Sequence, residues 1–383
     1  MRTIGVVTVG RSDYSYYVPV LRRMAAERGM RAHLIVSGMH LVPEFGRTEQ
    51  SILRDGFPIG DRVEMLVASD TPEGVAKSIG LGAIGFAQSY ARCRPDILLV
   101  LGDRFEMFSA VVAALPMRIP VAHVHGGELT EGAMDDAVRH SITKMSHLHF
   151  VATEEYARRV TQLGEEPERV IVSGAPSLDN LRGLRLSSRA ALEKRHGLRL
   201  QKPFLLATFH PVTLEYEQTE QQITEFLAAL DHAGLPVVFT YPNADMGSRL
   251  ILEKTRRYVA QHRNAWIIAN LGTGDYFSMM KYAAAMIGNS SSGIIEAASF
   301  RLPVVNVGNR QRGRVRGKNV QDVECRRGPI AAAIREATSA SFLKSLANLV
   351  NPYGDGRAAE RIVARLKAAP LDGSLIQKRF FQS

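Results

Sequence analysis

The sequence predicts an α/β protein built from two parallel sheets that helices cover on both faces. Short runs of Val, Ile and Leu recur at regular intervals, and continuous rather than alternating runs are typical of strands buried on both sides. Turn residues and a helical pattern follow each run. The whole pattern restarts near residue 180. We therefore expect two Rossmann-like domains.

The expected strands fall into two groups. In the first half of the chain they cover Thr3–Val9, Ala32–Val36, Ile97–Leu101, Pro120–Val124, Leu148–Ala152 and Val170–Val172. In the second half they cover Phe204–Thr208, Val237–Thr240, Trp266–Ala269, Ala285–Ile287 and Val304–Val307. Helical patterns lie between them, among others at Tyr17–Arg28, Ile84–Arg92, Asp136–Met145 and Glu217–Ala233.

The domain boundary is expected after residue 178, shortly before a polar helical stretch at Leu186–Arg195 and a turn at Gly197. The first domain would then cover residues 1–178 and the second residues 179–354. In residues 355–383 we expect a helix with an amphipathic pattern, Asp355–Lys367, that returns to the first domain. Two such domains facing one another would form a cleft at the carboxyl ends of their strands, where open α/β sheets bind ligands.

Composition narrows the class of protein. The 383 residues are 45% hydrophobic and 22% charged, which is typical of a globular protein and excludes disorder as the main state. With only two cysteines, Cys93 and Cys325, a disulfide scaffold is excluded. The net charge of +10 comes without a nucleic-acid-binding motif. An anionic metabolite as ligand, or simply an arginine-rich proteome, therefore explains this charge better than nucleic acid. Because no run of about 18 apolar residues occurs, we expect a cytoplasmic protein without a membrane partner.

The strongest local signal is the segment Ile287-Gly-Asn-Ser-Ser-Ser-Gly-Ile-Ile-Glu296 at the end of an expected strand. Backbone N–H groups of Ser291, Ser292 and Gly293 would point out of a helix start and bind a diphosphate. Glu296 could accept both hydroxyls of a ribose. A plain serine N-cap would also explain part of the pattern. A helix N-cap requires only one serine, whereas this segment has three serines and a glycine. We therefore favour the diphosphate site.

Two more segments follow strands of the second half. His210 lies in Thr208-Phe-His-Pro-Val-Thr213, where its imidazole could contact phosphate, although a loop histidine is often only solvated. Asn243 lies in Tyr241-Pro-Asn-Ala-Asp245, after the next strand. Both would lie at the same edge of the sheet as the serine segment, because the strands are expected to be parallel.

The first half supplies acidic groups. Asp103 and Arg104 end one strand, and the segment His123-Val-His125-Gly-Gly-Glu128 ends another. Asp135 stands in the first turn of a helix, a position that the helix dipole favours by itself. His123 and His125 share a strand face and could bind a metal together with Asp103, but no clear metal motif supports that alternative. Two carboxylates and a histidine at one edge suit proton removal and delivery at a sugar carbon.

The loop Gly10-Arg-Ser-Asp-Tyr-Ser15 follows the first strand. It lacks the glycines of a dinucleotide fingerprint, yet Arg11 and Ser15 could reach a phosphate or a sugar. From these residues alone, an enzyme acting on a nucleotide sugar is the best interpretation. A retaining glycosyltransferase fits equally well, and a non-catalytic nucleotide-sugar sensor is a third possibility.

The order of these motifs resembles a known family. GRSDYS, LGDRFE, HVHGGELTEG, DDAVRHSITKMSHLHF, TFHPVT, YPNAD and IGNSSSGIIEA follow one another as in the hydrolysing UDP-N-acetylglucosamine 2-epimerases of sialic-acid-type sugar synthesis, from about residue 3 to Arg314. The resemblance implies a glycosyltransferase-B-type fold, no nicotinamide or metal cofactor, and a homodimer or homotetramer. It also implies release of UDP by anti elimination to a glycal, which water then hydrates to free N-acetylmannosamine.

The same resemblance assigns roles to residues. Asp103 and Asp135 match the catalytic acids of the family, and we add His125 and Glu128 of the HVHGGE segment to this group. The positions that match those holding UDP are Arg11, Ser15, Arg104, His210, Asn243, Ser290, Ser291, Glu296 and Arg310. Some members carry a glutamate where this chain has His125, which leaves the third acid–base group open. The expected substrate is UDP-N-acetylglucosamine, and the alternative is a UDP-2,4-diacetamido-2,4,6-trideoxy sugar of legionaminic-type pathways.

Overall fold

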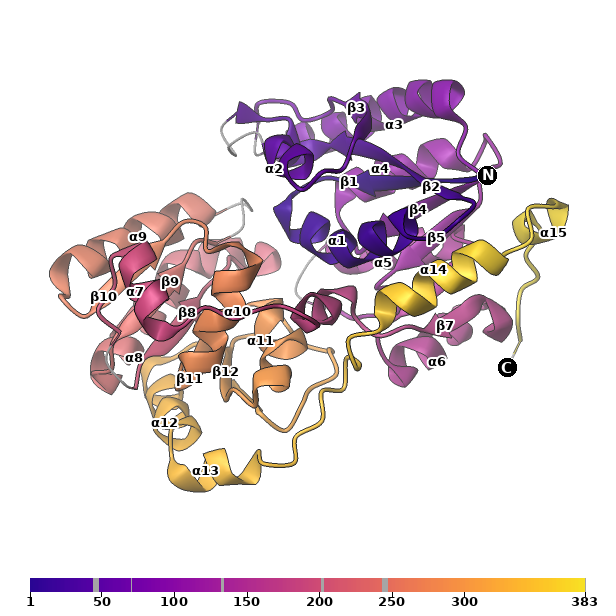
Figure 1. Ribbon diagram of the computed structural model, residues 1–383. Coiled ribbons are helices and arrows are strands. Elements are labelled where there is room, and N and C mark those ends of the chain that lie inside the picture. Colours follow the sequence, from indigo (N-terminus) through magenta and orange to yellow (C-terminus); the bar gives the residue numbers. More distant parts are fainter. Residues whose placement is uncertain (44–47, 70, 132–133, 201–202, 243–246, 383) are drawn as a thin grey trace. The chain divides into compact units, whose positions relative to one another are not determined.

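The computed structural model describes residues 1–43, 48–69, 71–131, 134–200, 203–242 and 247–382. The chain forms two compact units. Unit 1 contains residues 1–128, 135–182 and 353–383, and unit 2 contains residues 129–134 and 183–352. Each unit has one parallel sheet with helices packed on it, so the predicted α/β fold with two Rossmann-like domains is confirmed (Figure 1).

Unit 1 has a seven-stranded sheet in the order β3-β2-β1-β4-β5-β6-β7, and all neighbouring strands are parallel. The strands are β1 (Arg2–Thr8), β2 (Met30–Ser37), β3 (Ile59–Val63), β4 (Ile97–Leu101), β5 (Val121–Val124), β6 (Leu148–Val151) and β7 (Val170–Val172). The helices are α1 (Arg11–Ala25), α2 (Glu49–Arg54), α3 (Pro72–Cys93), α4 (Phe105–Ala114), α5 (Asp135–Met145), α6 (Glu154–Gln162), α14 (Ala358–Ala368) and α15 (Gly373–Ile376).

Unit 2 has a six-stranded sheet in the order β10-β9-β8-β11-β12-β13, again parallel throughout. The strands are β8 (Leu205–Thr208), β9 (Val237–Thr240), β10 (Ala265–Ile268), β11 (Ala285–Gly288), β12 (Val304–Val307) and β13 (Val320–Val323). The helices are α7 (Arg189–His196), α8 (Thr219–Ala233), α9 (Ser248–Gln261), α10 (Gly272–Tyr282), α11 (Ser291–Ile295), α12 (Arg327–Ala337) and α13 (Ala340–Ser345).

Both sheets repeat one topology. In unit 1 the strand order reverses between β1 and β4, and in unit 2 it reverses between β8 and β11. Open α/β sheets bind ligands outside the carboxyl ends of the strands at such a switch point. The segments that begin at Val9 and Gly102 in unit 1, and at Phe209 and Asn289 in unit 2, are therefore the places to look for a site.

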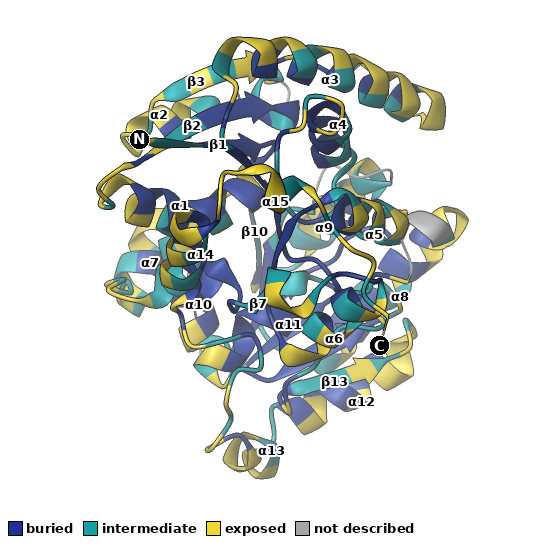
Figure 2. Ribbon diagram, turned by 90° about the vertical axis from the view of Figure 1, so that its right-hand side faces the viewer, coloured by how far each residue is buried: buried dark blue, intermediate teal, exposed yellow. Residues whose placement is uncertain are grey.

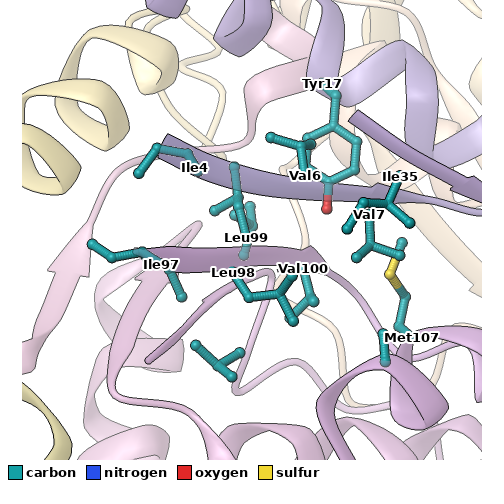
Figure 3. Packing of buried hydrophobic residues seen from close by; sticks show 14 of the residues in the cluster. Ile4, Val6, Val7, Tyr17, Ile35, Ile97, Leu98, Leu99, Val100 and Met107 are labelled. Carbon is teal, nitrogen blue, oxygen red and sulfur yellow. The ribbon is translucent and has the colours of Figure 1, made fainter. Parts of the chain in front are cut away.

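The core of unit 1 surrounds its central strands. Figure 3 shows Tyr17 of α1 beside Val6 of β1, and Met107 of α4 beside Val7 of the same strand. Successive residues of a strand point to opposite faces, so the two helices cover both faces of β1. All four side chains are at most 1% exposed. In Figure 2 the central strands are accordingly dark, while the helices carry exposed residues on their outer faces.

Two strands lie outside the sequence prediction. β3 and β13 each form one edge of their sheet, and most of their residues are only partly buried. Their sequences, IGDRV and VQDV, mix polar with apolar residues because an edge strand does not need two apolar faces. The rule that identified the central strands, a continuous apolar run, cannot detect such edges.

The chain passes between the units more than once. The prediction placed boundaries after residues 178 and 354 and returned residues 355–383 to the first domain. The structure divides the chain after residues 182 and 352, and it also groups residues 129–134 with unit 2. Within unit 1, helix α14 lies beside α1 (Figure 1). The backbone N–H groups of Ala358 and Ala359 at its start donate to the carboxylate of Asp179, at 2.9 and 2.7 Å. A carboxylate at this position satisfies two of the donors that a helix start leaves open.

Two further findings concern the helices and the cysteines. Among the helices of the described ranges, none is both long and apolar enough to span a bilayer. Cys93 and Cys325 are both free thiols. Burial raises the pKa of each thiol, that of Cys325 to about 12, so neither is an activated nucleophile.

Candidate active site

The first group of predicted residues lies where β4 ends in unit 1. Gly102 has a φ of +77°, and the turn that it makes leads directly to Asp103 and Arg104, before α4 begins. The guanidinium of Arg104 donates two hydrogen bonds to the carboxylate of Glu106, both at 3.1 Å, and Glu106 is fully buried. Arg104 itself keeps a quarter of its side chain exposed. This pairing fixes its direction at the carboxyl edge of the sheet.

Arg139 connects three segments of this edge. It stands in the second turn of α5, is 1% exposed, and is one of the largest fully buried side chains of the protein. It forms an ion pair with Asp103, donates to the carbonyl oxygen of Glu128 at 2.8 Å, and lies 4.0 Å from Asp136. A buried guanidinium needs such partners, because an unpaired buried charge is strongly unfavourable. Arg139 thus fixes Asp103 next to the end of β5.

His123 is a structural residue in this arrangement. Its Nε2 lies 2.7 Å from the carbonyl oxygen of Gly102, and its Nδ1 lies 3.1 Å from the hydroxyl of Thr143. A carbonyl only accepts, so Nε2 carries the proton and Nδ1 accepts from Thr143. Burial lowers the pKa of His123 to about 3, which keeps the ring neutral. Both ring nitrogens of His123 are thus occupied within the protein, which argues against the alternative of a metal bound by His123, His125 and Asp103.

His125 and Glu128 form a buried pair just after β5. His125 Nδ1 lies 2.5 Å from a carboxylate oxygen of Glu128, and the two side chains are 7% and 2% exposed. The ring of Tyr16 from α1 meets the His125 ring edge-on, with centroids 5.3 Å apart. His125 has a φ of +65°, a conformation that costs a residue with a side chain about 1 kcal/mol or more. Such strain is typical of functional sites.

The remaining predicted residues of unit 1 lie on helix starts. Asp135 is the first residue of α5 and is partly buried. The structure corrects the predicted loop around Arg11 and Ser15, because α1 begins at Arg11 and both residues belong to it. Arg11 is exposed. The hydroxyl of Ser15 donates to the carbonyl of Ser12 at 2.8 Å.

Asn289 organises the carboxyl edge of unit 2. Its side chain accepts from the backbone N–H of His210 at 2.7 Å and donates to the carbonyl of His210 at 2.8 Å. Its own carbonyl accepts from Arg310 at 3.2 Å and from Gln311 at 2.9 Å. The segments after β8, β11 and β12 are thereby held together at the switch point. Burial lowers the pKa of His210 well below its usual value, so its imidazole is neutral.

The serine segment begins immediately after Gly288. A Cβ atom at this glycine would lie 1.8 Å from the carbonyl oxygen of Thr208, so only glycine allows β11 to approach β8 here. Ser290 caps α11 by accepting from the N–H of Ser292 at 3.3 Å, and Gly293 donates to its carbonyl at 3.1 Å. Two of the three N–H groups expected to point outward therefore bond to Ser290. Any anion bound at this segment must therefore accept hydrogen bonds from the serine hydroxyls more than from the backbone N–H groups.

Tyr276 completes this segment. Its phenol lies near the hydroxyls of Ser290, Ser292 and Thr208, and burial raises its pKa to about 12. Glu296 follows α11 directly and is 3% exposed. Asn243 lies outside the described residues. The carboxyl edge of unit 2 therefore presents a neutral histidine, an arginine, several hydroxyls and one buried carboxylate.

Several of these residues were not singled out from the sequence. Arg139 and Asn289 lie inside the quoted motifs DDAVRH and IGNSSSG, but only the structure shows that each joins three segments. Tyr276 has no local signal at all, because its partners come from β8 and from the segment after β11. In the described ranges, one group of side chains has the composition of a metal site, namely His33, Asp61 and Cys93, and it belongs to β2, β3 and the end of α3.

Fold and site together define the class of this protein. Two Rossmann-like units, each with polar and charged side chains at the carboxyl edge of its sheet, are the architecture of the glycosyltransferase-B type. The solved structure of UDP-GlcNAc 2-epimerase from Neisseria meningitidis bound to UDP-GlcNAc has the same fold, with a TM-score of 0.83 over 96% of this chain and 100% of that one, at 18% identity.

Sequence comparison identifies the family. The family model described as UDP-N-acetylglucosamine 2-epimerase matches residues 22–367. The UDP-N,N'-diacetylbacillosamine 2-epimerase (hydrolyzing) of Legionella pneumophila is 38% identical over 99% of both chains. The GDP/UDP-N,N'-diacetylbacillosamine 2-epimerase (hydrolyzing) of Campylobacter jejuni is 39% identical over 84% of both. The chain belongs to the UDP-N-acetylglucosamine 2-epimerase family, and the resemblance noted from its motifs is confirmed.

Proposed function

We propose that the protein is a hydrolysing 2-epimerase whose substrate is UDP-N,N'-diacetylbacillosamine, a 6-deoxy sugar nucleotide with acetamido groups at C2 and C4. The observation that carries this proposal is the 38% identity over 99% of both chains with the Legionella relative of that activity. The Campylobacter relative, at 39% identity, supports the same sugar. This is the alternative substrate of the sequence analysis rather than the expected one.

UDP-N-acetylglucosamine remains a second candidate. The description of the matching family names that sugar, and the motifs by themselves favoured it. The two candidate sugars differ at C4 and C6, where one carries an acetamido group and a methyl group and the other two hydroxyls. A site that recognises one of these patterns discriminates against the other, because a buried polar group left without its partner is unfavourable.

The proposed reaction has two stages. A base removes the proton at C2 while the bond from C1 to UDP breaks, and the C–H electron pair becomes the double bond of a glycal. Water then supplies a hydroxyl at C1, and a proton returns to the opposite face of C2. One UDP-sugar and one water thus give UDP and the free C2 epimer, without oxidation or reduction.

Two groups of residues divide this work in the proposal. The acid–base group, whose members move protons or position the residues that do, consists of Asp103, Asp135, His125 and Glu128 of unit 1, as the contacts at the ends of β4 and β5 suggest. The groups proposed to hold UDP are Arg11, Ser15, Arg104, His210, Asn243, Ser290, Ser291, Glu296 and Arg310. The hydroxyls and the arginine around Asn289 are suited to a diphosphate, since arginine and hydroxyl donors bind phosphate oxygens well.

The experiment that tests the proposal offers each UDP-sugar separately in heavy water and follows the products by NMR. We expect UDP and a free sugar with inverted C2 that carries deuterium there, since the returning proton comes from an exchangeable acid. We also expect kcat/KM for the diacetamido sugar to be at least about tenfold higher than for UDP-N-acetylglucosamine. Faster turnover of UDP-N-acetylglucosamine would favour the second candidate, and a product with its original C2 hydrogen would indicate plain hydrolysis.

Two sets of variants test the division of labour. Asp103→Asn and Asp135→Asn should lower turnover at least about 100-fold while UDP still binds, because an amide cannot transfer the proton. Ser290→Ala and Glu296→Gln should mainly weaken UDP binding. The division is wrong if a serine variant loses turnover with unchanged affinity for UDP. Light scattering on the same preparations will test the predicted homodimer or homotetramer.

A further inference from the structure

The pair formed by His125 and Glu128 has a defined chemical orientation. A carboxylate can only accept a hydrogen bond, so the 2.5 Å contact places a proton on His125 Nδ1. In the neutral ring, Nε2 then carries the lone pair. Nε2 is buried and has no hydrogen-bond partner among the described residues. The lone pair of His125 Nε2 therefore accepts no hydrogen bond from any described residue, and this nitrogen can act as a base.

The surroundings hold the imidazole in this orientation. The backbone N–H of His125 donates to the carbonyl of Phe150 on β6 at 2.9 Å, which fixes the residue despite its positive φ. Arg139 holds the carbonyl of Glu128, and the Tyr16 ring lies edge-on to the imidazole. The residue is thus held by neighbours on three elements, β6, α5 and α1, as expected for a group that must be oriented before it reacts.

Compared with Asp103, His123 and Glu128, His125 has a buried nitrogen, Nε2, that has no hydrogen-bond partner among the described residues. The carboxylate of Asp103 is in an ion pair with the buried Arg139. Both nitrogens of His123 are occupied by Gly102 and Thr143. The carboxylate of Glu128 lies against His125 and is 2% exposed. This comparison singles out His125 Nε2 as the proton acceptor to test, and Glu128 as a group that would act through its neighbour.

We propose that His125 Nε2 is the base that removes the C2 proton and that Glu128 is a positioning residue, an inference that rests on the proposed function. The Nε2 lone pair takes the proton, the C2–H electron pair forms the C1=C2 bond, and UDP departs with the electron pair of the C1–O bond. The imidazolium that results is stabilised by the Glu128 carboxylate at Nδ1. The proton that returns to the opposite face of C2 comes from another acid of this cluster.

The first measurement uses the wild-type protein. Nitrogen-15 NMR distinguishes protonated from unprotonated ring nitrogens, and the His125→Gln variant identifies the signals of His125 among the 11 histidines. We expect a protonated Nδ1 and an unprotonated Nε2 in the resting enzyme. The opposite tautomer would overturn the proposal. This readout does not depend on turnover, so it remains informative if the wild type releases no UDP, which would contradict the proposed function itself.

The second measurement is the Glu128→Gln variant. We expect kcat to fall at least about 100-fold with KM changed less than about threefold, because the amide cannot stabilise the imidazolium. Substrate deuterated at C2 should react more slowly than normal substrate, and this isotope effect should grow in the variant as C–H cleavage becomes slower. Retained UDP affinity will show that the variant is folded. His125→Gln should lose turnover as well.

A matched control makes the same carboxylate-to-amide change at an exposed position. Glu154 is the first residue of α6 and is exposed, so Glu154→Gln should keep kcat, KM and the isotope effect of the wild type. If Glu128→Gln also keeps them while the wild type epimerises its substrate, the role of Glu128 is refuted and the proposed function still stands. A folded His125→Gln variant with wild-type kcat would refute the role of His125.

Discussion

Asp13 is a buried polar residue of unit 1 whose pKa and hydrogen bonds are set by its surroundings. It lies in α1, is 5% exposed, and accepts from the hydroxyl of Thr8 at 2.7 Å and the N–H of Val9 at 3.0 Å. Thr8 in turn lies 3.0 Å from His40 Nε2. Burial raises the pKa of Asp13 to about 6, and burial lowers that of His40 to about 4. This chain of polar groups connects the end of β1 to the start of α1.

The raised pKa of Asp13 predicts a specific pH dependence. The folded state prefers protonated Asp13, so its contribution to stability is complete below the unfolded pKa of 3.8 and is lost as pH rises through about 6. The two pKa values differ by about two units, which corresponds to about 3 kcal/mol. In Asp13→Asn this loss disappears. Urea unfolding at pH 4 and pH 7 should show that the free energy of unfolding of the wild type falls, relative to that of the variant, as the pH rises. Equal changes in both proteins would contradict this prediction.

At the scale of elements, α1 shows how one helix is fitted to its neighbours. Pro19 lies inside it and lacks an N–H, so the carbonyl of Ser15 one turn earlier loses its intrahelical donor. Asn180 supplies a replacement by donating to that carbonyl at 2.8 Å. The 3₁₀ turn Pro176–Leu181, which contains Asn180, packs against α1, and Asp179 caps α14 from the same turn. One short segment thus satisfies two helices.

The C-terminal segment after α14 is tied to a buried carboxylate. Lys378 donates to Glu165 at 2.9 Å and to the carbonyls of Lys144 and Ser146 at 2.6 and 2.7 Å. Glu165 is 1% exposed. Burial alone would raise the pKa of Glu165, but hydrogen bonds from His149, Lys144 and Lys378 lower it to about 2. A lowered pKa stabilises the fold above pH 4.5, and this contribution is lost as pH falls toward 2.

We expect Lys378→Met to lower the free energy of unfolding by about 1–3 kcal/mol at pH 7, because a buried carboxylate loses a charged donor. The difference from wild type should narrow as pH falls from 4.5 toward 2, where Glu165 becomes protonated. Lys367→Met is the matched control, since Lys367 pairs with Glu27 at the surface and is 53% exposed. It should cost less than about 1 kcal/mol. Equal losses in both variants would contradict the role of Glu165.

At the scale of the whole molecule, unit 1 is not a continuous stretch of chain. Its core includes Ile362, Val363 and Leu366 of α14, which lie beside α1 although about 340 residues separate them in sequence. Each is at most 1% exposed. Burial of one such side chain stabilises a fold by about 1.5–3 kcal/mol. A unit built from residues 1–182 alone would leave this face of α1 in water.

This arrangement predicts how fragments behave. Residues 1–182 expressed alone should lack a cooperative thermal transition, because α14 and the segment that binds Glu165 are missing. Residues 1–182 joined to 353–383 by a flexible Gly/Ser linker should unfold cooperatively. Circular dichroism melting curves will compare the two proteins. A shorter fragment that melts like the linked one would show that α14 adds little to unit 1.

The sequence by itself determined the two parallel sheets, their central strands and the segments that gather at their carboxyl edges. These features are local, because a continuous apolar run ending in turn residues carries its own signal. The edge strands β3 and β13 and the inclusion of residues 129–134 in unit 2 appeared only in the structure. The same is true of the contacts of Arg139, Asn289 and Tyr276. They depend on which strands become neighbours. The sequence motif presents His125 as one of two similar histidines, and only the tertiary contacts separate the occupied ring of His123 from the open Nε2 of His125.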